Sequence, residues 1–321
     1  MTIISKDITQ ASALLAQEEL VAIPTETVYG LAGNIFSEKA IRKIFQLKKR
    51  PLFNPLIVHI HDSTQLVDIV SDLPEKAKLL ADHFWPGSLT LILKKKDHIP
   101  DLVTAGKDTV GLRMPMHPLT LRLLEETGFP IAAPSANPFG SISPTEAAHV
   151  ARYFEGELPM ILDGGPCQRG IESTIVGFEG EAPVIYRLGA IAVEDIEKVV
   201  GPVPLKNKKE KAPDAPGMLS RHYAPQTNTY LVEDAQKFLT TQSGKKIGLL
   251  LFNKSIQAPN AEIVKVLSVK GDLEAAAAKL YATLHELDQL NLDMIVAERF
   301  PDVGLGKSIN DRLLRATKKA D

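Results

Sequence analysis

The sequence predicts an α/β protein with two domains, in which a large N-terminal domain carries a mixed sheet and a smaller α/β domain follows it. Short apolar runs of strand length alternate with helical patterns through residues 1–200, which favours α/β over a helical bundle. The order is not strictly strand–helix–strand, so we expect parallel and antiparallel pairs in the sheet. The alternation stops at residues 201–225 and resumes through residues 226–321, which indicates two domains.

Local signals predict the elements of the first domain. Helical apolar spacing predicts a helix over residues 8–19, and Ser37 is a suitable N-cap for a second helix. Further helices are expected to start at Pro74, Pro118 and Pro144, because proline fits the first turn of a helix. Short apolar runs predict strands over residues 20–23, 56–60, 88–93, 109–114, 130–133, 159–162, 173–178 and 184–187.

Residues 201–225 combine prolines and lysines with few apolar residues, which is typical of an extended linker. The segment contains Tyr223, and an extended segment with a tyrosine is suited to folding over a ligand as a lid. The second domain would position and tether this lid without chemistry of its own. In that domain we expect strands over residues 229–232, 246–252, 262–267 and 294–298 and helices over residues 272–290 and 308–317.

Charge and composition exclude several classes of protein. The 37 Lys and Arg residues nearly balance the 39 Asp and Glu residues, so an RNA contact would need a local basic patch. Cys167 is the single cysteine, which excludes an intrachain disulfide and a cysteine-based zinc site. No apolar stretch is long enough to span a membrane and the first residues lack a signal-peptide pattern, so we expect a soluble cytoplasmic protein.

Hydroxyl and carboxylate side chains gather in the turn of residues 24–31, directly after a predicted strand. Such a turn either seats a small polar ligand or is simply well capped. Lys48 and Arg50 end a helix, where basic residues also suit the helix dipole, and Asn54 follows shortly afterwards. His59 lies inside an apolar run, so it is either a site residue or a core histidine.

Arg113 and Arg187 both lie in predicted strands between apolar neighbours. A half-buried arginine must be paired or must face an anion, and neither residue has an acidic partner close in the sequence. The two positions therefore favour an anionic ligand such as a carboxylate or a phosphate. The alternative is an internal ion pair with Glu26, Asp163 or Glu172.

Two loops of small residues, 133–145 and 163–175, carry glycines and hydroxyl groups. Free N–H groups and hydroxyls at helix N-termini bind phosphate, although an ordinary capping loop has the same composition. No histidine base accompanies Cys167, so its thiol is not expected to be a nucleophile. The Gly-Lys-Ser at residues 306–308 is not a phosphate loop, because Pro301 stands where that motif requires glycine.

Taken in order, several of these segments resemble the motifs of the YrdC-like family, and residues 215–225 with the second domain resemble its long two-domain form. The resemblance implies a twisted mixed sheet around a basic concave cavity and a Rossmann-like second domain, with the linker crossing the cavity. One departure is Leu188, where the family usually has proline. The matching segments are residues 24–31, 48–51, 55–59, 85–90, 113–115, 134–137 and 173–175.

Members of the long form are threonylcarbamoyl-AMP synthases, so the resemblance implies an enzyme of the nucleotidyltransferase class. Its substrates would be L-threonine, bicarbonate and ATP with Mg²⁺, and its products threonylcarbamoyl-AMP, pyrophosphate and water. A downstream transferase would then move the threonylcarbamoyl group to an adenosine of tRNA.

Carried over by motif, the resemblance implies that L-threonine binds at Thr27, His59, Arg113, Ala133 and Ser173, with Arg113 on the carboxylate. It implies that ATP binds at Arg50, Asn54, Thr109, Ser135, Ser143, Arg187 and Tyr223, with Lys48 and Arg50 stabilising charge. The motifs hold donors and arginines but no carboxylate pair. That set suits attack on an α-phosphate, which mainly needs reactant placement and charge neutralisation.

Two other functions stay open at this point. In the first, the basic cavity holds RNA or a nucleotide without turnover, which makes the chain a binding module. That interpretation gives no reason for a linker that carries Tyr223. In the second, the C-terminal domain binds a nucleotide on its own, although it has no phosphate loop.

Overall fold

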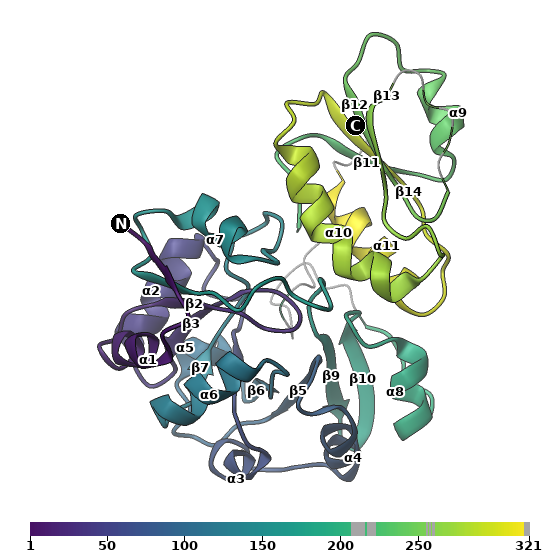
Figure 1. The fold of residues 1–321 in the computed structure, drawn as a ribbon. Coiled ribbons are helices and arrows are strands. Elements are labelled where there is room, and N and C mark those ends of the chain that lie inside the picture. The colour runs from purple at the N-terminus through teal and green to yellow at the C-terminus, as the bar shows by residue number, and fades with distance from the viewer. Residues whose placement is uncertain (207–215, 217–222, 255, 257, 259–260, 318–321) are drawn as a thin grey trace.

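The computed structural model of the 321-residue chain describes residues 1–206, 216, 223–254, 256, 258 and 261–317. Residues 207–215 and 217–222 lie outside this part of the chain, and they make up most of the predicted linker. The expected lid is therefore described only at its two ends and at Pro216. Two sheets, one in each half of the chain, form the framework of the molecule (Figure 1).

The first sheet has ten strands and is mixed, as the sequence predicts. The strands are β1 (Ile3–Ser5), β2 (Val21–Ile23), β3 (Gly30–Asn34), β4 (Ile57–His59), β5 (Leu89–Lys94), β6 (Thr109–Arg113), β7 (Ile131–Ala132), β8 (Met160–Leu162), β9 (Thr174–Glu179) and β10 (Ala182–Arg187). Their order is β1-β8-β2-β3-β7-β4-β6-β5-β9-β10. Strands β4 and β6 are parallel with His59 opposite Arg113, so both side chains lie at the same end of neighbouring strands.

Strand β3 does not follow from the sequence pattern, because two glycines and an asparagine replace the usual apolar residues. Tertiary contacts create it instead. It pairs with β2 on one side and with β7 on the other. Gly33 also lets a neighbouring helix approach closely, since a Cβ at this position would lie 3.0 Å from Ile44 and 3.1 Å from Leu20.

Helices flank the first sheet, and two of these α-helices begin at a residue whose side chain caps them. Ser37 accepts a hydrogen bond from the Ala40 N–H, which confirms it as an N-cap, and Asp7 caps the first helix in the same way. The helices are α1 (Ile8–Ala16), α2 (Glu38–Lys48), α3 (Leu66–Ile69), α4 (Glu75–Phe84), α5 (Asp101–Thr104), α6 (Pro118–Thr127), α7 (Ala147–Phe154) and α8 (Val193–Val200), with a 3₁₀ turn at Ser63–Gln65.

The predicted helix start at Pro144 is wrong, because α7 begins only at Ala147. The carbonyl groups before the helix have partners elsewhere. The Pro144 carbonyl accepts from the Tyr29 N–H at 2.8 Å, and the Thr145 carbonyl accepts from the Cys167 N–H at 2.8 Å. These bonds tie the 24–31 turn and the 163–175 loop together, which the sequence does not reveal.

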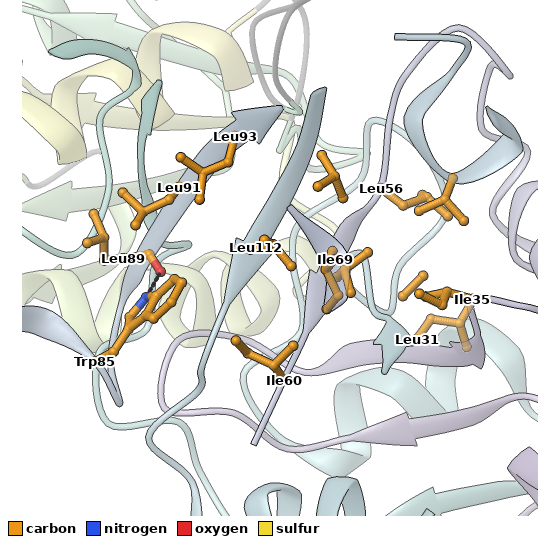
Figure 2. Packing of buried hydrophobic residues seen from close by; sticks show 14 of the residues in the cluster. Leu31, Ile35, Leu56, Ile60, Ile69, Trp85, Leu89, Leu91, Leu93 and Leu112 are labelled. Atoms are coloured by element: carbon orange, nitrogen blue, oxygen red, sulfur yellow. Dashed lines mark hydrogen bonds between the residues drawn. The ribbon is translucent and has the colours of Figure 1, made fainter. Parts of the chain in front are cut away.

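The core of the first domain packs apolar side chains from the central strands into one cluster (Figure 2). Leu31, Leu91 and Leu112 come from three different strands and are fully buried. Trp85 joins them, and its indole Nε1–H donates to the Leu89 carbonyl at 2.8 Å, so its polar edge is paired inside the core. This packing makes a rigid platform for the polar residues at the strand ends.

The second sheet is parallel and has four strands in the order β11-β14-β12-β13. Its strands are β11 (Thr229–Val232), β12 (Ile247–Leu251), β13 (Ala261–Val266) and β14 (Met294–Glu298), and its helices are α9 (Ala235–Leu239), α10 (Leu273–Asp288) and α11 (Leu305–Ala316). Successive strand residues face opposite sides, since Leu250 packs with α10 and α11 whereas Leu249 packs with α9. The predicted Rossmann-like, three-layer arrangement is therefore confirmed. No helix of the described residues meets the length and apolar character of a membrane span.

Helices α10 and α11 lie on the side of the second sheet that faces the first domain (Figure 1). Lys307 of α11 pairs with Glu194 of α8 at 2.8 Å. The ring of His285 on α10 stacks on that of His149 on α7, with centroids 3.8 Å apart and planes at 20°. The two domains are therefore in direct contact, and both stacked rings are buried in their interface.

Acid should weaken this interface. Burial lowers the pKa of His149 to about 3 and that of His285 to about 4, against 6.5 for both in an unfolded chain. Below pH 6.5 the unfolded chain binds more protons, so the stability from each neutral ring is complete above that pH and is lost as the pH falls toward 4. The loss approaches about 1.4 kcal/mol per pH unit for each ring.

Thermal unfolding measured between about pH 7.5 and 4.5 tests this prediction. The unfolding temperature should fall with acidification, and His149→Phe should reduce the slope. His83→Gln is the control, because that ring is exposed on α4. An unchanged slope in the His149→Phe protein would contradict the expectation.

Candidate functional site

A cavity of about 510 Å³, including its open mouth, lies at the ends of several strands of the first sheet, beside Pro216 and Tyr223. The turn after β2, the ends of β4, β6 and β10, and the segments around β7 and β9 all contribute side chains. Its lining residues are Thr27, Val28, Arg50, Ile57, His59, Arg113, Ala133, Pro134, Ser135, Glu172, Ser173, Arg187, Pro216 and Tyr223.

The 24–31 turn shows both roles that the sequence allows. Thr25 caps it, because its hydroxyl donates to the Val28 carbonyl at 2.7 Å and accepts from the Val28 N–H at 3.2 Å. Thr27 lines the cavity, with its hydroxyl 2.8 Å from that of Thr25. The turn is therefore well capped and also presents a polar group to the cavity.

Arg113 forms the internal ion pair that the sequence leaves as an alternative. Its Nη2 lies 2.7 Å from Oε1 of Glu26, and both side chains are buried. Burial alone would raise the pKa of Glu26, but the charge and hydrogen bond of Arg113 hold it below its ordinary value. The Nε of Arg113 donates to the Gly87 carbonyl at 3.2 Å. Among the described residues Nη1 has no partner, so an anchored arginine presents one free edge to the cavity.

His59 is buried beside Arg113, and its Nδ1 has no hydrogen-bond partner among the described residues. Burial and the charge of Arg113 lower the pKa of His59 to about 3, so the ring is neutral at physiological pH. A core histidine normally satisfies both ring nitrogens. An unpaired nitrogen in a residue that lines a cavity is instead typical of a ligand contact.

Arg50 and Arg187 supply positive charge that no carboxylate among the described residues neutralises within 4.0 Å. Arg50 donates to the carbonyl of Asn54 at 3.1 Å and to its Oδ1 at 2.8 Å. Arg187 donates to the carbonyl and hydroxyl of Ser173 at 2.9 and 3.0 Å. Burial lowers the pKa of Arg50 to about 9, which still leaves it protonated at neutral pH. Buried cations held only by neutral groups favour an anionic ligand.

Lys48 lies behind the cavity wall. Its ammonium is fully buried and donates to the carbonyls of Ser135 and Asn137, so it fixes the loop that carries Ser135. Burial and the like charge of Arg50 hold the pKa of Lys48 well below its ordinary value. The group predicted to stabilise phosphate charge is thus engaged with the loop.

The structure brings together all five residues predicted to bind L-threonine, and Arg50, Ser135, Arg187 and Tyr223 of the ATP set also line the cavity. Asn54, Thr109 and Ser143 do not. Asn54 orients Arg50, Thr109 lines a separate small cavity, and Ser143 donates to Glu172 at 2.6 Å. Their roles, like those of the other site residues, stay predictions.

Glu172 is the lining residue that the sequence reasoning missed as part of the site. It precedes the Ser173-Thr174 motif directly, but the sequence suggested it only as a possible partner of an arginine. Its carboxylate is buried and accepts from Ser143 and from two residues of the second domain, Tyr281 and Arg312. No sequence signal links residues so far apart. The apolar lining residues Val28, Ile57 and Pro134 also escaped prediction.

The fold and cavity define an α/β protein of two domains with a buried cationic site. A family model described as "Telomere recombination" matches residues 13–189, and one described as "Threonylcarbamoyl-AMP synthase, C-terminal domain" matches residues 191–317. The chain belongs to the threonylcarbamoyl-AMP synthase family in its long, two-domain form.

Individual relatives cover nearly the whole chain. The threonylcarbamoyl-AMP synthase of Bacillus subtilis is 45% identical over 320 residues, which span 96% of this chain and 92% of the relative. The crystal structure of Pyrococcus abyssi Sua5 complexed with L-threonine matches with a TM-score of 0.91 and 38% identity, covering 99% of this chain and 97% of that one. Escherichia coli YciO, at 22% identity and a TM-score of 0.51, covers 59% of this chain and 96% of its own, and shares the fold.

Lys48→Met should destabilise the protein, because it removes the ammonium that donates to the Ser135 and Asn137 carbonyl groups, and among the described residues only that of Ser135 keeps a second donor, the Asn137 N–H at 3.0 Å. We expect a loss of about 2–4 kcal/mol in the free energy of unfolding, measured by urea denaturation. Lys39→Met on the same helix is the matched control, since its ion pair with Glu18 is exposed. Equal stability of the two variants would contradict the assigned contacts.

Proposed function

We propose that this chain condenses L-threonine, bicarbonate and ATP into threonylcarbamoyl-AMP, with release of pyrophosphate and water. The observation that carries the proposal is the cavity in which Arg50 and Arg187 have no carboxylate partner among the described residues while Arg113 presents a free edge. Such a cavity suits a ligand set with both a carboxylate and phosphates. Membership of the synthase family supports the same reaction.

The threonine side of the proposed site is the Arg113 side. The free edge of Arg113 would hold the substrate carboxylate, and the unpaired Nδ1 of His59 would accept or donate a hydrogen bond beside it. The hydroxyls of Thr27 and Ser173 and the backbone at Ala133 line the same cavity and complete a pocket for a small hydroxy amino acid. The likeness to Pyrococcus abyssi Sua5, whose crystal structure is a complex with L-threonine, supports L-threonine as the ligand.

The ATP side is the Arg50 and Arg187 side. These guanidinium groups would neutralise the phosphates, with Ser135 and Tyr223 as further contacts. Asn54 would act through Arg50 and Ser143 through Glu172, while Thr109 would act from the neighbouring small cavity. Mg²⁺ would enter as part of the substrate MgATP, because Glu172, the lining carboxylate, is already held by Ser143, Tyr281 and Arg312.

In the proposed reaction the amine of L-threonine takes up the carbon of bicarbonate to give a carbamate with loss of water. A carbamate oxygen then attacks the α-phosphorus, the bond to the bridging oxygen breaks, and pyrophosphate leaves. The protein contributes alignment and charge neutralisation. Glu172 does not serve as a base in this reaction. Burial would raise the pKa of its carboxyl group, but the charges of Arg312 and Arg187 lower that pKa to about 2.

The product would pass to a transferase that modifies adenosine in tRNA, and since ATP and tRNA are substrates of that route, the reaction would take place in the cytoplasm. Any contact of this chain with RNA would use a local basic patch, because the formal net charge is −2.

The direct assay measures pyrophosphate release by the purified chain with MgATP, bicarbonate and L-threonine. Release should require both L-threonine and bicarbonate. Equal release without threonine would mean a simple ATP pyrophosphohydrolase. Tight ATP binding with no release under any condition would favour the binding module instead.

Arg113→Ala should weaken L-threonine binding much more than ATP binding. A charged hydrogen-bonded contact contributes roughly 1.5–3 kcal/mol, which corresponds to about 10- to 150-fold in the dissociation constant measured by calorimetry. Arg113→Lys should restore little, because an ammonium lacks the planar fork.

Arg113→Ala also leaves Glu26 buried without its cation, so the double variant Arg113→Ala/Glu26→Gln separates loss of the fold from loss of the contact. Arg42→Ala, which removes an exposed arginine from α2, is the control. Unchanged threonine affinity in a folded Arg113→Ala protein would remove Arg113 from the proposed site.

A further inference from the structure

The carboxylate of Glu172 joins the cavity to the second domain. Its Oε1 accepts from the hydroxyl of Ser143, in the first domain, at 2.6 Å. On its other side Oε2 accepts from the hydroxyl of Tyr281 on α10 at 3.0 Å and from Nε of Arg312 on α11 at 2.8 Å. All four side chains are buried, so these bonds are shielded from water.

Arg312 holds two further parts of the cavity wall. Its Nη2 donates to the Leu188 carbonyl at 2.7 Å, directly after Arg187 at the end of β10. Its guanidinium lies over the ring of Tyr223, 4.8 Å from the centroid. Tyr281 stacks on the same ring, with centroids 5.9 Å apart and planes at 28°. Two side chains of the second domain thus hold the ring of Tyr223.

Charges alternate along this network. Arg315 pairs with Asp311 at 2.9 Å, Asp311 pairs with Arg312 at 2.8 Å, and Arg312 pairs with Glu172 at 2.8 Å. Arg187 is not paired with Glu172, but the charges of the two groups interact. Arg187 contributes to the lowered pKa of Glu172, and Glu172 partly offsets the lowering of the Arg187 pKa by burial. Because Arg312 satisfies Glu172, Arg187 stays available to an anion in the cavity.

We propose that Arg312 is a positioning residue for the ATP side of the cavity, supplied by the second domain: it holds Glu172 away from Arg187 and fixes the ring of Tyr223. The second domain then shares in building the nucleotide site and does more than tether a linker. Besides Arg312, Arg187 is the other arginine whose charge lowers the pKa of the buried Glu172 carboxyl group. Without Arg312, an Arg187–Glu172 pair would neutralise the charge that the phosphates need. The identity of the nucleotide as ATP rests on the proposed function.

Other contacts join the two domains without reaching the cavity. Lys307 lies on the same helix as Arg312 and pairs with Glu194 at 2.8 Å, in a partly exposed position. Arg169 pairs with Glu274 at 3.1 Å, also at the surface. These pairs can hold the domains together, so they offer a control that weakens the interface and leaves Glu172 untouched.

The test compares Arg312→Gln with Lys307→Gln in the full-length chain. We expect Arg312→Gln to raise the KM for ATP and the Kd of a non-hydrolysable ATP analogue at least tenfold, while the Kd of L-threonine changes less than twofold. The double variant Arg312→Gln/Glu172→Gln should recover nucleotide affinity to within about threefold of the wild type, because Glu172→Gln removes the carboxylate that would pair with Arg187. Lys307→Gln should change neither affinity.

Tyr281→Phe provides a second route in case Arg312→Gln does not fold. It removes one hydrogen bond to Glu172 and keeps the ring beside Tyr223, so we expect a smaller rise in the nucleotide Kd, about threefold. Unchanged nucleotide affinity in both variants would overturn the proposal, as would an equal loss of threonine and nucleotide affinity. Analogue binding is measured without turnover. A wild type that binds the analogue but releases no pyrophosphate would overturn the proposed function, and the binding data would still test the role of Arg312.

Discussion

The site depends on two buried guanidinium groups, those of Arg50 and Arg187, which have no carboxylate partner among the described residues. Removing a cation from water is costly unless other groups solvate it. Arg50 and Arg187 donate hydrogen bonds to neutral carbonyl oxygens, which solvate them. These are the oxygens of Asn54, Pro55, Ser173 and Pro216. Neutral oxygens stabilise the cations and leave their charge available, so the loops that carry these oxygens must be held rigidly.

The loop that leads into β9 shows how closely this region is packed. At Gly189 a Cβ would lie 2.3 Å from the carbonyl carbon of Ser173 and 2.4 Å from the amide nitrogen of Thr174, which no side chain can accept. Ser308 of α11 donates to the Gly189 carbonyl at 2.8 Å from the second domain. The backbone at Ser173, which solvates Arg187, is therefore held between the end of β10 and α11.

Local signals predicted those parts of the fold that depend on local physics. The strands at Thr229–Val232 and Met294–Glu298 match their apolar runs, and Ser37 caps its helix as expected. Strand β3 escaped prediction because its glycines, which allow neighbouring elements to pack closely, interrupt the apolar pattern of a strand. Motif resemblance led to the lining of the cavity, including His59 and Arg113. It could not lead to Glu172, whose partners come from helices far along the chain, or to the Glu26 partner of Arg113, where three acidic residues were equally plausible from sequence.

The location of Arg312 on α11 sets an order of events during synthesis. Every strand of the first sheet leaves the ribosome before α11 does, so the cavity's walls exist before its charge balance is complete. Until α11 docks, Glu172 lacks the cation that pairs with it, and Arg187 is the arginine of the first domain whose charge acts on it. If the proposed role of Arg312 holds, a chain whose second domain is not yet folded would have a self-neutralised site, and it would gain its full affinity for the nucleotide only after α11 docks.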